Sequence, residues 1–369
     1  MRRATNLARA AAAAALAAGL LAPAAPAAAQ AVIKVNDNVS FKLGFQFQGW
    51  ADWSQSASTG GYAQNLFARR ARLLVGGQVA KDVTFFFQTD SGNLGKVNPA
   101  GAKQTNTGFV IQDAFVSWKL NDAFTLEAGH FLVPLSRNIL QSTLSFFTLD
   151  ISPASTVMAG PTQTNGLRDN GFQAKGYLVD GGRLEYRAAV MQGVRDSASR
   201  NSLRTAGYLQ YNFFETERGY VFAGTNLGKK KVVNVSAGAD LQKDYRAFSG
   251  DVFATIPVAK GDEVGGQVQW IRYDGGDFLA SIPKQDDLLV EAAYYLSSAK
   301  VQPFLKYESQ SFANAADEAK DVERFGGGLN WYVSGQNFKI TAQVLRVEPK
   351  SSTVKPTNQF TVQLQAFYF

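Results

Sequence analysis

From Val39 to the end of the chain, apolar residues alternate with polar or small residues in segments of about 9 to 13 residues. In segment 124–131, for example, the apolar side chains of Phe124 and Leu126 share one face, and the residues between them share the other. A period of two predicts β-strands that are apolar on one side, and strands of this length are typical of membrane β-barrels. Sixteen strands are predicted, at 39–53, 66–80, 83–90, 109–120, 124–131, 168–179, 183–192, 204–213, 231–242, 245–258, 264–273, 287–297, 300–309, 322–333, 337–347 and 358–369.

The connections between these predicted strands alternate between long and short. Bacterial outer-membrane barrels have this rhythm, because their periplasmic turns are short and their external loops are long. Two connections break it: 214–230 is too long for a periplasmic turn, and the external connection at 243–244 is too short. A soluble β-sandwich is the alternative fold, but it does not require loop lengths to alternate.

The third long connection, 132–167, is the longest in the chain. It contains Pro134, Pro153 and Pro161 and shows no sustained period of 2 or 3.6. Connections of this length are uncommon in a compact domain and are usually functional. We therefore expect this third external loop to fold into the bore of the barrel and narrow it.

The strand count and the membrane environment together predict an all-β, 16-stranded antiparallel transmembrane β-barrel. In hydrocarbon each unpaired backbone group costs several kcal/mol, so a β-protein there must close on itself and leave no edge. A barrel of about 16 strands also leaves a water-filled bore. Such a protein is expected to act as a channel.

The N-terminal residues predict export. Residues 1–9 are basic, an Ala/Leu-rich run follows, and 27–29 are three alanines before Gln30, as in a secretory signal peptide with a small-residue cleavage site. We expect a signal peptide at 1–29 and the barrel domain at 30–369. The signal contains three arginines, so its removal lowers the net charge from +7 to +4. This mild excess, on an exported chain, gives no reason to expect a nucleic-acid partner.

Alternation also assigns the side chains of each strand to lipid or to the bore. In strand 66–80 it assigns Phe67 and Ala71 to lipid and Arg70 and Arg72 to the bore. A lipid-facing Arg or Lys costs about 2 to 4 kcal/mol at the membrane midplane, so cations are expected inside. The candidate pore-lining cations, including Arg137 of the long loop, are Arg70, Arg72, Arg137, Arg187, Arg183, Lys175, Arg204 and Arg324. The same assignment places Lys306 and Lys339 inside, with the carboxylates of Asp113, Glu127, Asp240, Glu291 and Glu308.

A row of inward arginines predicts a path for anions. Arg70 and Arg72 are two residues apart on a strand, which separates them by roughly 7 Å along the wall. Their guanidinium groups are always charged and offer planar donors that match phosphate and carboxylate. The alternative is that these arginines pair with the inward carboxylates and only fill space, which would leave a general diffusion channel with weak ion selectivity.

Catalysis finds little support in the sequence. The single histidine, His130, precedes Ser136 and Asp150 of the long loop, so a Ser/His/acid arrangement is the only enzymatic alternative. No nucleophile elbow, metal-ligand cluster or nucleotide-binding loop accompanies these residues. We therefore expect no enzyme activity and no cofactor. The three lysines at 229–231 are expected to form a solvated turn at the barrel rim.

Several segments resemble a known family. Residues 129–136 read Gly-His-Phe-Leu-Val-Pro-Leu-Ser and resemble the segment that opens the constriction loop of the phosphate-selective porins O and P. The resemblance runs from about Val39 to Phe369, and its other segments, in order, are 67–72, 112–115, 168–172, 219–220, 227–231 and 291–295.

The resemblance implies a homotrimer of 16-stranded barrels in the lipid of the bacterial outer membrane. It also implies passive diffusion of small anions, such as phosphate or polyphosphate, along arginines of the wall. Arg70 and Arg72 match the paired arginines of the family. The chain departs from the family at His130 and Leu135, and its constriction loop carries Arg137 as its one cation.

Overall fold

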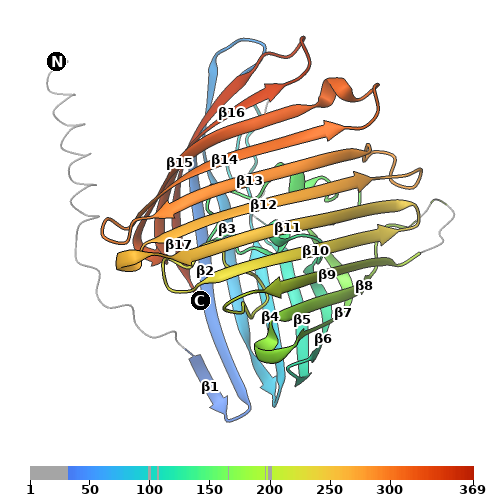
Figure 1. Cartoon of the computed structure of the whole chain (residues 1–369), viewed down its shortest axis with the longest axis vertical. Coiled ribbons are helices and arrows are strands. Elements are labelled where there is room, and N and C mark those ends of the chain that lie inside the picture. The colour runs from blue at the N-terminus through green and yellow to red at the C-terminus, as the bar shows by residue number, and fades with distance from the viewer. Residues whose placement is uncertain (1–31, 99–100, 106–107, 165, 196, 198–201) are drawn as a thin grey trace. The chain divides into compact units, whose positions relative to one another are not determined.

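Strands β2 to β17 form one closed antiparallel sheet in the part of the chain that the computed structural model describes, residues 32–98, 101–105, 108–164, 166–195, 197 and 202–369. Each strand pairs with the next along the chain, and the ring closes where β17 pairs with β2 (Figure 1). The prediction of a 16-stranded antiparallel β-barrel is therefore confirmed. One short strand, β1 (Val32–Asn36), was not predicted and pairs with β2.

Each predicted strand corresponds to one observed strand, with bounds that differ by a few residues. The barrel strands are β2 (Val39–Gln55), β3 (Tyr62–Ala80), β4 (Val83–Asp90), β5 (Val110–Asn121), β6 (Phe124–Leu132), β7 (Arg168–Leu178), β8 (Leu184–Met191), β9 (Arg204–Asn212), β10 (Val232–Gln242), β11 (Tyr245–Pro257), β12 (Glu263–Asp274), β13 (Gln285–Tyr295), β14 (Val301–Phe312), β15 (Val322–Gln336), β16 (Phe338–Pro349) and β17 (Thr357–Tyr368). Residues 33–369 form one contact unit and residues 1–32 another. The signal peptide predicted at 1–29 lies outside the described residues.

The connections have the predicted rhythm. Short connections such as 81–82 and 122–123 lie at one end of the barrel, which we call the short end, and long ones such as 91–109 lie at the other, the long end. Both predicted exceptions are confirmed. The 213–231 connection is long although it joins β9 to β10 at the short end, and 243–244 is short although it joins β10 to β11 at the long end.

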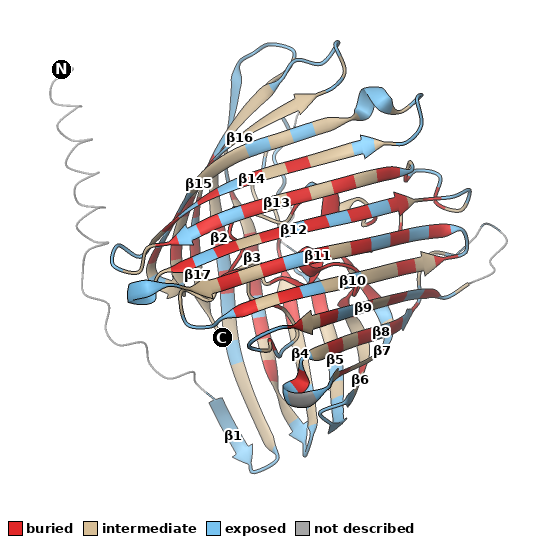
Figure 2. Cartoon of the chain, viewed as in Figure 1, coloured by how far each residue is buried: buried red, intermediate tan, exposed pale blue. Residues whose placement is uncertain are grey.

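Buried and more exposed residues alternate along the wall strands, as the sequence predicts (Figure 2). In β12, Gln267 and Gln269 are almost fully buried, while Val268 and Trp270 between and beside them are 44% and 39% exposed. Exposed apolar residues on the outside suit contact with lipid, and polar residues inside suit a wet bore. Among the described residues, no helix is long and apolar enough to cross a membrane.

The facing assigned to Phe67 was wrong. The pairing of β2 with β3 shifts by one residue at Arg69, which is a β-bulge. A bulge adds an unpaired residue and reverses the facing of everything on one side of it. Phe67 is therefore only 7% exposed and lies edge-on to Trp50, with ring centroids 5.7 Å apart, whereas Leu66 is the exposed residue.

The long connection 133–167 packs against the wall strands β8 to β14 through apolar side chains. Leu135, Ile139 and Leu140 belong to a buried cluster with Tyr208 and Tyr273 of those strands. The helix α2 (Arg137–Leu140) begins at Ser136, whose hydroxyl accepts from the amide of Ile139. Phe147 of the same connection packs among buried residues of β10, β11, β13 and β14.

A glycine of β10 allows the closest approach. A Cβ placed on Gly238 would overlap the carbonyl oxygen of Leu135, which accepts a 2.6 Å hydrogen bond from the Ser249 hydroxyl of β11. The backbone of the long connection therefore touches the wall directly at this point.

Candidate functional site

Two arginines of β3 hold one carboxylate of the long connection. Arg70 Nη2 lies 2.5 Å from Asp150 Oδ1, and Arg69 Nη2 lies 2.8 Å from Asp150 Oδ2. Arg69 reaches the same carboxylate as Arg70 because the bulge at Arg69 turns its side chain to the inner face. Burial opposes ionisation of Asp150, but the charges of Arg69 and Arg70 outweigh this and hold the pKa of the carboxyl below its usual range.

The same stretch of the connection is tied to neighbouring strands. Arg72 of β3 pairs with Asp90 at 2.9 Å and lies 3.4 Å from the Thr143 hydroxyl. On the other side, Lys339 of β16 donates to the carbonyl oxygen of Leu144 at 2.9 Å. The polar contacts of residues 143–150 thus lie largely along β16, β17, β2 and β3, opposite their apolar contacts.

This contact carries an excess of positive charge. Among the described residues of this contact, Arg69, Arg70 and Arg72 form ion pairs with the carboxylates of Asp90 and Asp150, and Lys339 donates to a carbonyl oxygen. Arg69 is the accessible member, since 24% of its side chain is exposed against 4% for Arg70. An anion would therefore meet Arg69 directly, while the buried cations contribute through their field.

Arg137, by contrast, is neutralised. Its guanidinium lies 2.7 Å from Glu217 Oε2 and is only 1% exposed. It also donates to Gln210 at 3.0 Å and lies 3.6 Å from the ring centroid of Phe253. Arg137 therefore acts as a tether between the long connection and the 213–231 segment rather than as a free cation in the bore.

The 213–231 segment, which we call the short-end insert, enters the barrel and meets the long connection. The Phe222 amide donates to the Leu140 carbonyl at 2.8 Å, and the Ser142 amide donates back to the Phe222 carbonyl at 2.8 Å. The Tyr220 hydroxyl donates to Asp113 and accepts from the amide of Leu132. Sequence reasoning identified this segment as too long for a turn but did not predict its entry.

The other predicted cations are mostly paired with carboxylates on the wall. Arg187 lies 2.8 Å from Glu185, and its guanidinium also donates to the insert carbonyls of Gly219 and Tyr220. Arg204 is fully buried and makes two bonds to Asp240, at 2.5 and 2.7 Å. These pairs belong to the side of the wall against which the long connection packs.

Three predicted cations lie elsewhere. Lys175 pairs with Glu127 at 2.6 Å, and Arg324 donates to Gln310 at 2.7 Å. Arg183 lies before β8 in the short connection and is exposed, because β8 begins one residue later than predicted. It therefore does not join the inward cations of the wall.

Two of the three residues considered for catalysis have other roles. Ser136 caps α2, and Asp150 is held by Arg69 and Arg70. The three lysines 229–231 are exposed, as expected for a turn at the rim. In the described residues, no group of His, Cys, Asp or Glu is arranged to hold a metal ion.

Comparison of the sequence with family models finds one similar family. The model of the phosphate-selective porins O and P matches residues 41–211, a little less than half of the chain. The chain is similar to that family over this part, and the match together with the 16-stranded barrel indicates a protein of the bacterial outer membrane. The matched residues run from β2 to β9 and include the bulged arginine segment and the whole long connection. A search of curated proteins found no significant match.

Solved structures share the fold of this chain at low sequence identity. Salmonella typhi OmpF, in complex with daunomycin, is 16% identical with a TM-score of 0.56 and covers 92% of this chain and 100% of its own. The channel DcaP of Acinetobacter baumannii is 12% identical, has a TM-score of 0.58 and covers 92% and 100%. OprB of Pseudomonas putida is 9% identical, has a TM-score of 0.61 and covers 89% and 94%.

Proposed function

We propose that this porin is a passive channel for small anions, phosphate among them, and that the anions pass along the wall formed by β16, β17, β2 and β3. The observation that carries the proposal is the excess of cations over carboxylates where residues 143–150 touch that wall. Guanidinium groups replace part of the water around an anion. Because the arginines of this contact keep their carboxylate partners, they should bind an anion weakly enough to release it. The family description supports phosphate as the solute.

A general diffusion porin with weak ion selectivity is the second candidate. It is favoured by the pairing of Arg137, Arg187 and Arg204 with carboxylates, which removes most of the predicted arginine path. Asp52, further toward the long end of β2, also offsets part of the local excess. The two candidates differ in the sign and size of the reversal potential.

We also propose that the porin assembles as a homotrimer in outer-membrane lipid. The solved structure of OmpT of Vibrio cholerae, which shares the fold, is described as a trimer form. Apolar side chains exposed on the outer face of this chain, such as Leu66, Leu73 and Leu305, supply surface for lipid or for neighbouring subunits.

The test is the reversal potential of single channels in a planar bilayer under a KCl gradient, followed by addition of phosphate. We expect a potential on the chloride side and a reduction of chloride current by phosphate. Arg69→Gln should move the potential toward zero, and Asp150→Asn should move it further toward chloride, because it leaves two arginines without their acid. Lys320→Gln, an exposed cation of the 313–321 loop, is the matched control and should have a smaller effect. A cation-side potential, or equal shifts for Arg69→Gln and Lys320→Gln, would contradict anion passage along this wall.

A further inference from the structure

A cavity of about 860 Å³ lies inside the barrel toward the short end. It is bounded by the inner faces of β2 to β7, by the end of β17, by residues 141–144 of the long connection and by residues 219–221 of the short-end insert. Its size is within the range of small-molecule sites. The cavity thus lies on the short-end side of the contact between the two inward segments.

One side of this cavity is aromatic, which is unusual for the wall of a wet bore. The rings of Phe115 and Tyr220 lie 4.6 Å apart, and Phe86 lies 5.9 Å from each of them. The terminal residue Phe369 faces the same space, with its ring 5.8 Å from Phe86. Rings at these separations form edge and offset contacts, and a planar aromatic ring entering the cavity would make the same contacts.

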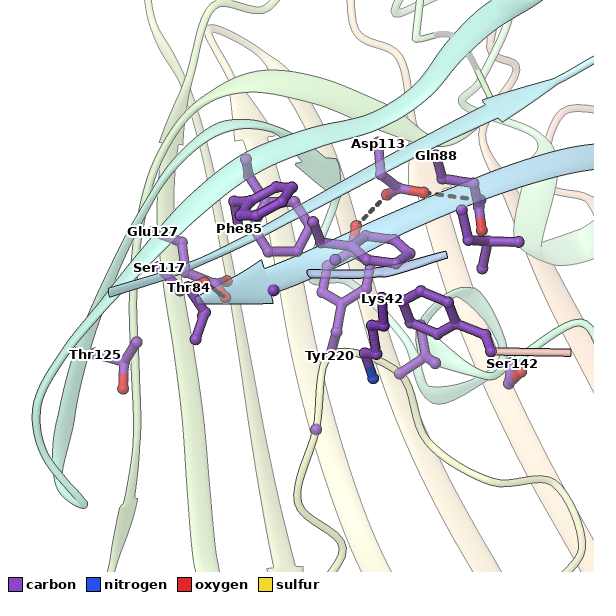
Figure 3. Close-up of a pocket in the computed structure, with 18 of the residues that line it drawn as sticks. Lys42, Thr84, Phe85, Gln88, Asp113, Ser117, Thr125, Glu127, Ser142 and Tyr220 are labelled. Carbon is purple, nitrogen blue, oxygen red and sulfur yellow. Dashed lines mark hydrogen bonds between the residues drawn. The ribbon is translucent and has the colours of Figure 1, made fainter. Parts of the chain in front are cut away.

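A cation accompanies the rings. Lys42 Nζ lies 4.2 Å from the ring centroid of Phe369, and Figure 3 shows Lys42 beside the aromatic side chains. Lys42 lines the cavity from β2, so its ammonium group can meet the charged end of a ligand whose ring contacts the aromatic side chains.

Two of the three acidic side chains that line the cavity already have cationic partners, which favours an anionic ligand. Asp113 accepts from Tyr220 and Gln88, as the dashed lines in Figure 3 mark, and pairs with Arg168 at 3.1 Å. Glu127 pairs with Lys175 at 2.6 Å. The third, Asp82, lies in the 81–82 turn at the short end. A cationic ligand at Asp113 or Glu127 would have to displace these partners, whereas an anion finds Lys42.

We infer that this cavity is a binding site for aromatic carboxylates, with the ring against Phe86, Phe115, Tyr220 and Phe369 and the carboxylate at Lys42. The inference rests on the proposed function, because it names a class of organic anion that the channel would hold before release at the short end. It adds a site that adjoins the arginine contact at Thr143 and Leu144 and that inorganic phosphate would not fill.

The test is isothermal titration calorimetry, in which benzoate is added to the folded, detergent-solubilised porin. Acetate lacks the ring and cyclohexanecarboxylate lacks its aromaticity, so both serve as matched ligands. We expect benzoate to bind at least about tenfold more tightly than either. Lys42→Gln and Phe115→Leu should each weaken benzoate binding about tenfold, as loss of a charged hydrogen bond or of a ring contact predicts.

The control variant is Phe248→Leu, which removes a ring from the outer face of β11, where it is 43% exposed. It should leave benzoate binding unchanged. Folding of Phe115→Leu is judged by heat-modifiable migration on a gel. If that variant folds poorly, the effect of Lys42→Gln on benzoate binding alone tests the site. Equal binding of benzoate and acetate, or no effect of Lys42→Gln, would overturn the inference.

Bilayer currents separate the failure of this inference from the failure of the proposed function. If the channel is anion-selective but benzoate and acetate reduce its current equally, the aromatic site is refuted and anion passage stands. If the channel is not anion-selective but calorimetry shows tight benzoate binding that depends on Lys42, the proposed function fails and the site stands.

Discussion

The contact between Arg137 and Glu217 joins the two segments that enter the barrel, so breaking it should release them from each other. Arg137→Met keeps a long apolar side chain between the rings of Phe222 and Phe253 but removes the charge. The variant loses two hydrogen bonds to Glu217, at 2.7 and 3.0 Å, one to Gln210 at 3.0 Å and one to the carbonyl of Ala223 at 2.9 Å. The Glu217 carboxylate is then left buried without its cation.

Removing one partner of a buried ion pair costs about 3 to 5 kcal/mol. We take about 4 kcal/mol, because Asn234 still donates to Glu217 in the variant and moderates the loss. At 1.36 kcal/mol for each factor of ten, this raises the population of separated segments by roughly 1000-fold. The barrel itself should remain folded, since its strands are held by a closed ladder of backbone bonds.

Amide hydrogen exchange measures this separation directly. The amides of Phe222 and Ser142 bond across the contact, so both should exchange roughly 1000-fold faster in Arg137→Met. The matched control is Arg218→Met, since Arg218 lies in the same insert and its pair with Asp122 is 45% and 59% exposed. An exposed pair contributes at most about 1 kcal/mol, so exchange should rise less than about tenfold. Equal exchange rates in the two variants would refute the tether.

Two further predictions concern the long connection. Gly238→Val should displace the backbone at Leu135, at a cost of about 1 to 3 kcal/mol, and change the single-channel conductance, whereas Gly250→Val, where an added Cβ meets nothing, should leave it unchanged. The second prediction is a pH dependence. The pKa of Asp150 is lowered in the folded state, so its contribution to holding the connection is present above the unfolded value near 4 and is lost only as pH falls toward the folded value. The difference in ion selectivity between wild type and Asp150→Asn should therefore be present throughout the range from about pH 8 to pH 4.5, and loss of that difference within the range would contradict the ion pair.

The strands could be predicted because the membrane constrains each one in the same way. A residue that faces lipid must be apolar and one that faces the bore is polar or small. Buried and more exposed residues therefore alternate along β12. The assignment failed at Phe67 because a bulge depends on local strand pairing, and a single extra residue leaves no signal in the apolar pattern. For the same reason Arg69 was assigned to no role, although it is the most accessible arginine of the candidate site.

The candidate site could be predicted only in part. Alternation placed Arg70, Arg72 and Lys339 inside the barrel, but it carries no information about which carboxylate each would meet. The partners come from segments far apart in the chain, as Asp150 does for Arg70 and Glu217 does for Arg137. Such pairs depend on how the long connection and the insert pack together, and loop sequences without periodicity do not specify this.

The long connection contacts two walls of the bore in different ways. Its apolar side chains pack against β8 to β14, where Arg137 and the short-end insert hold it in place. Its polar residues 143–150 are thereby turned toward β16, β17, β2 and β3, where cations exceed acids. The paired arginines on the packed wall fix the position of the connection, and the unbalanced cations on the other wall set the charge that a solute meets. Variants on the packed wall should therefore change conductance first, and variants on the other wall should change selectivity first.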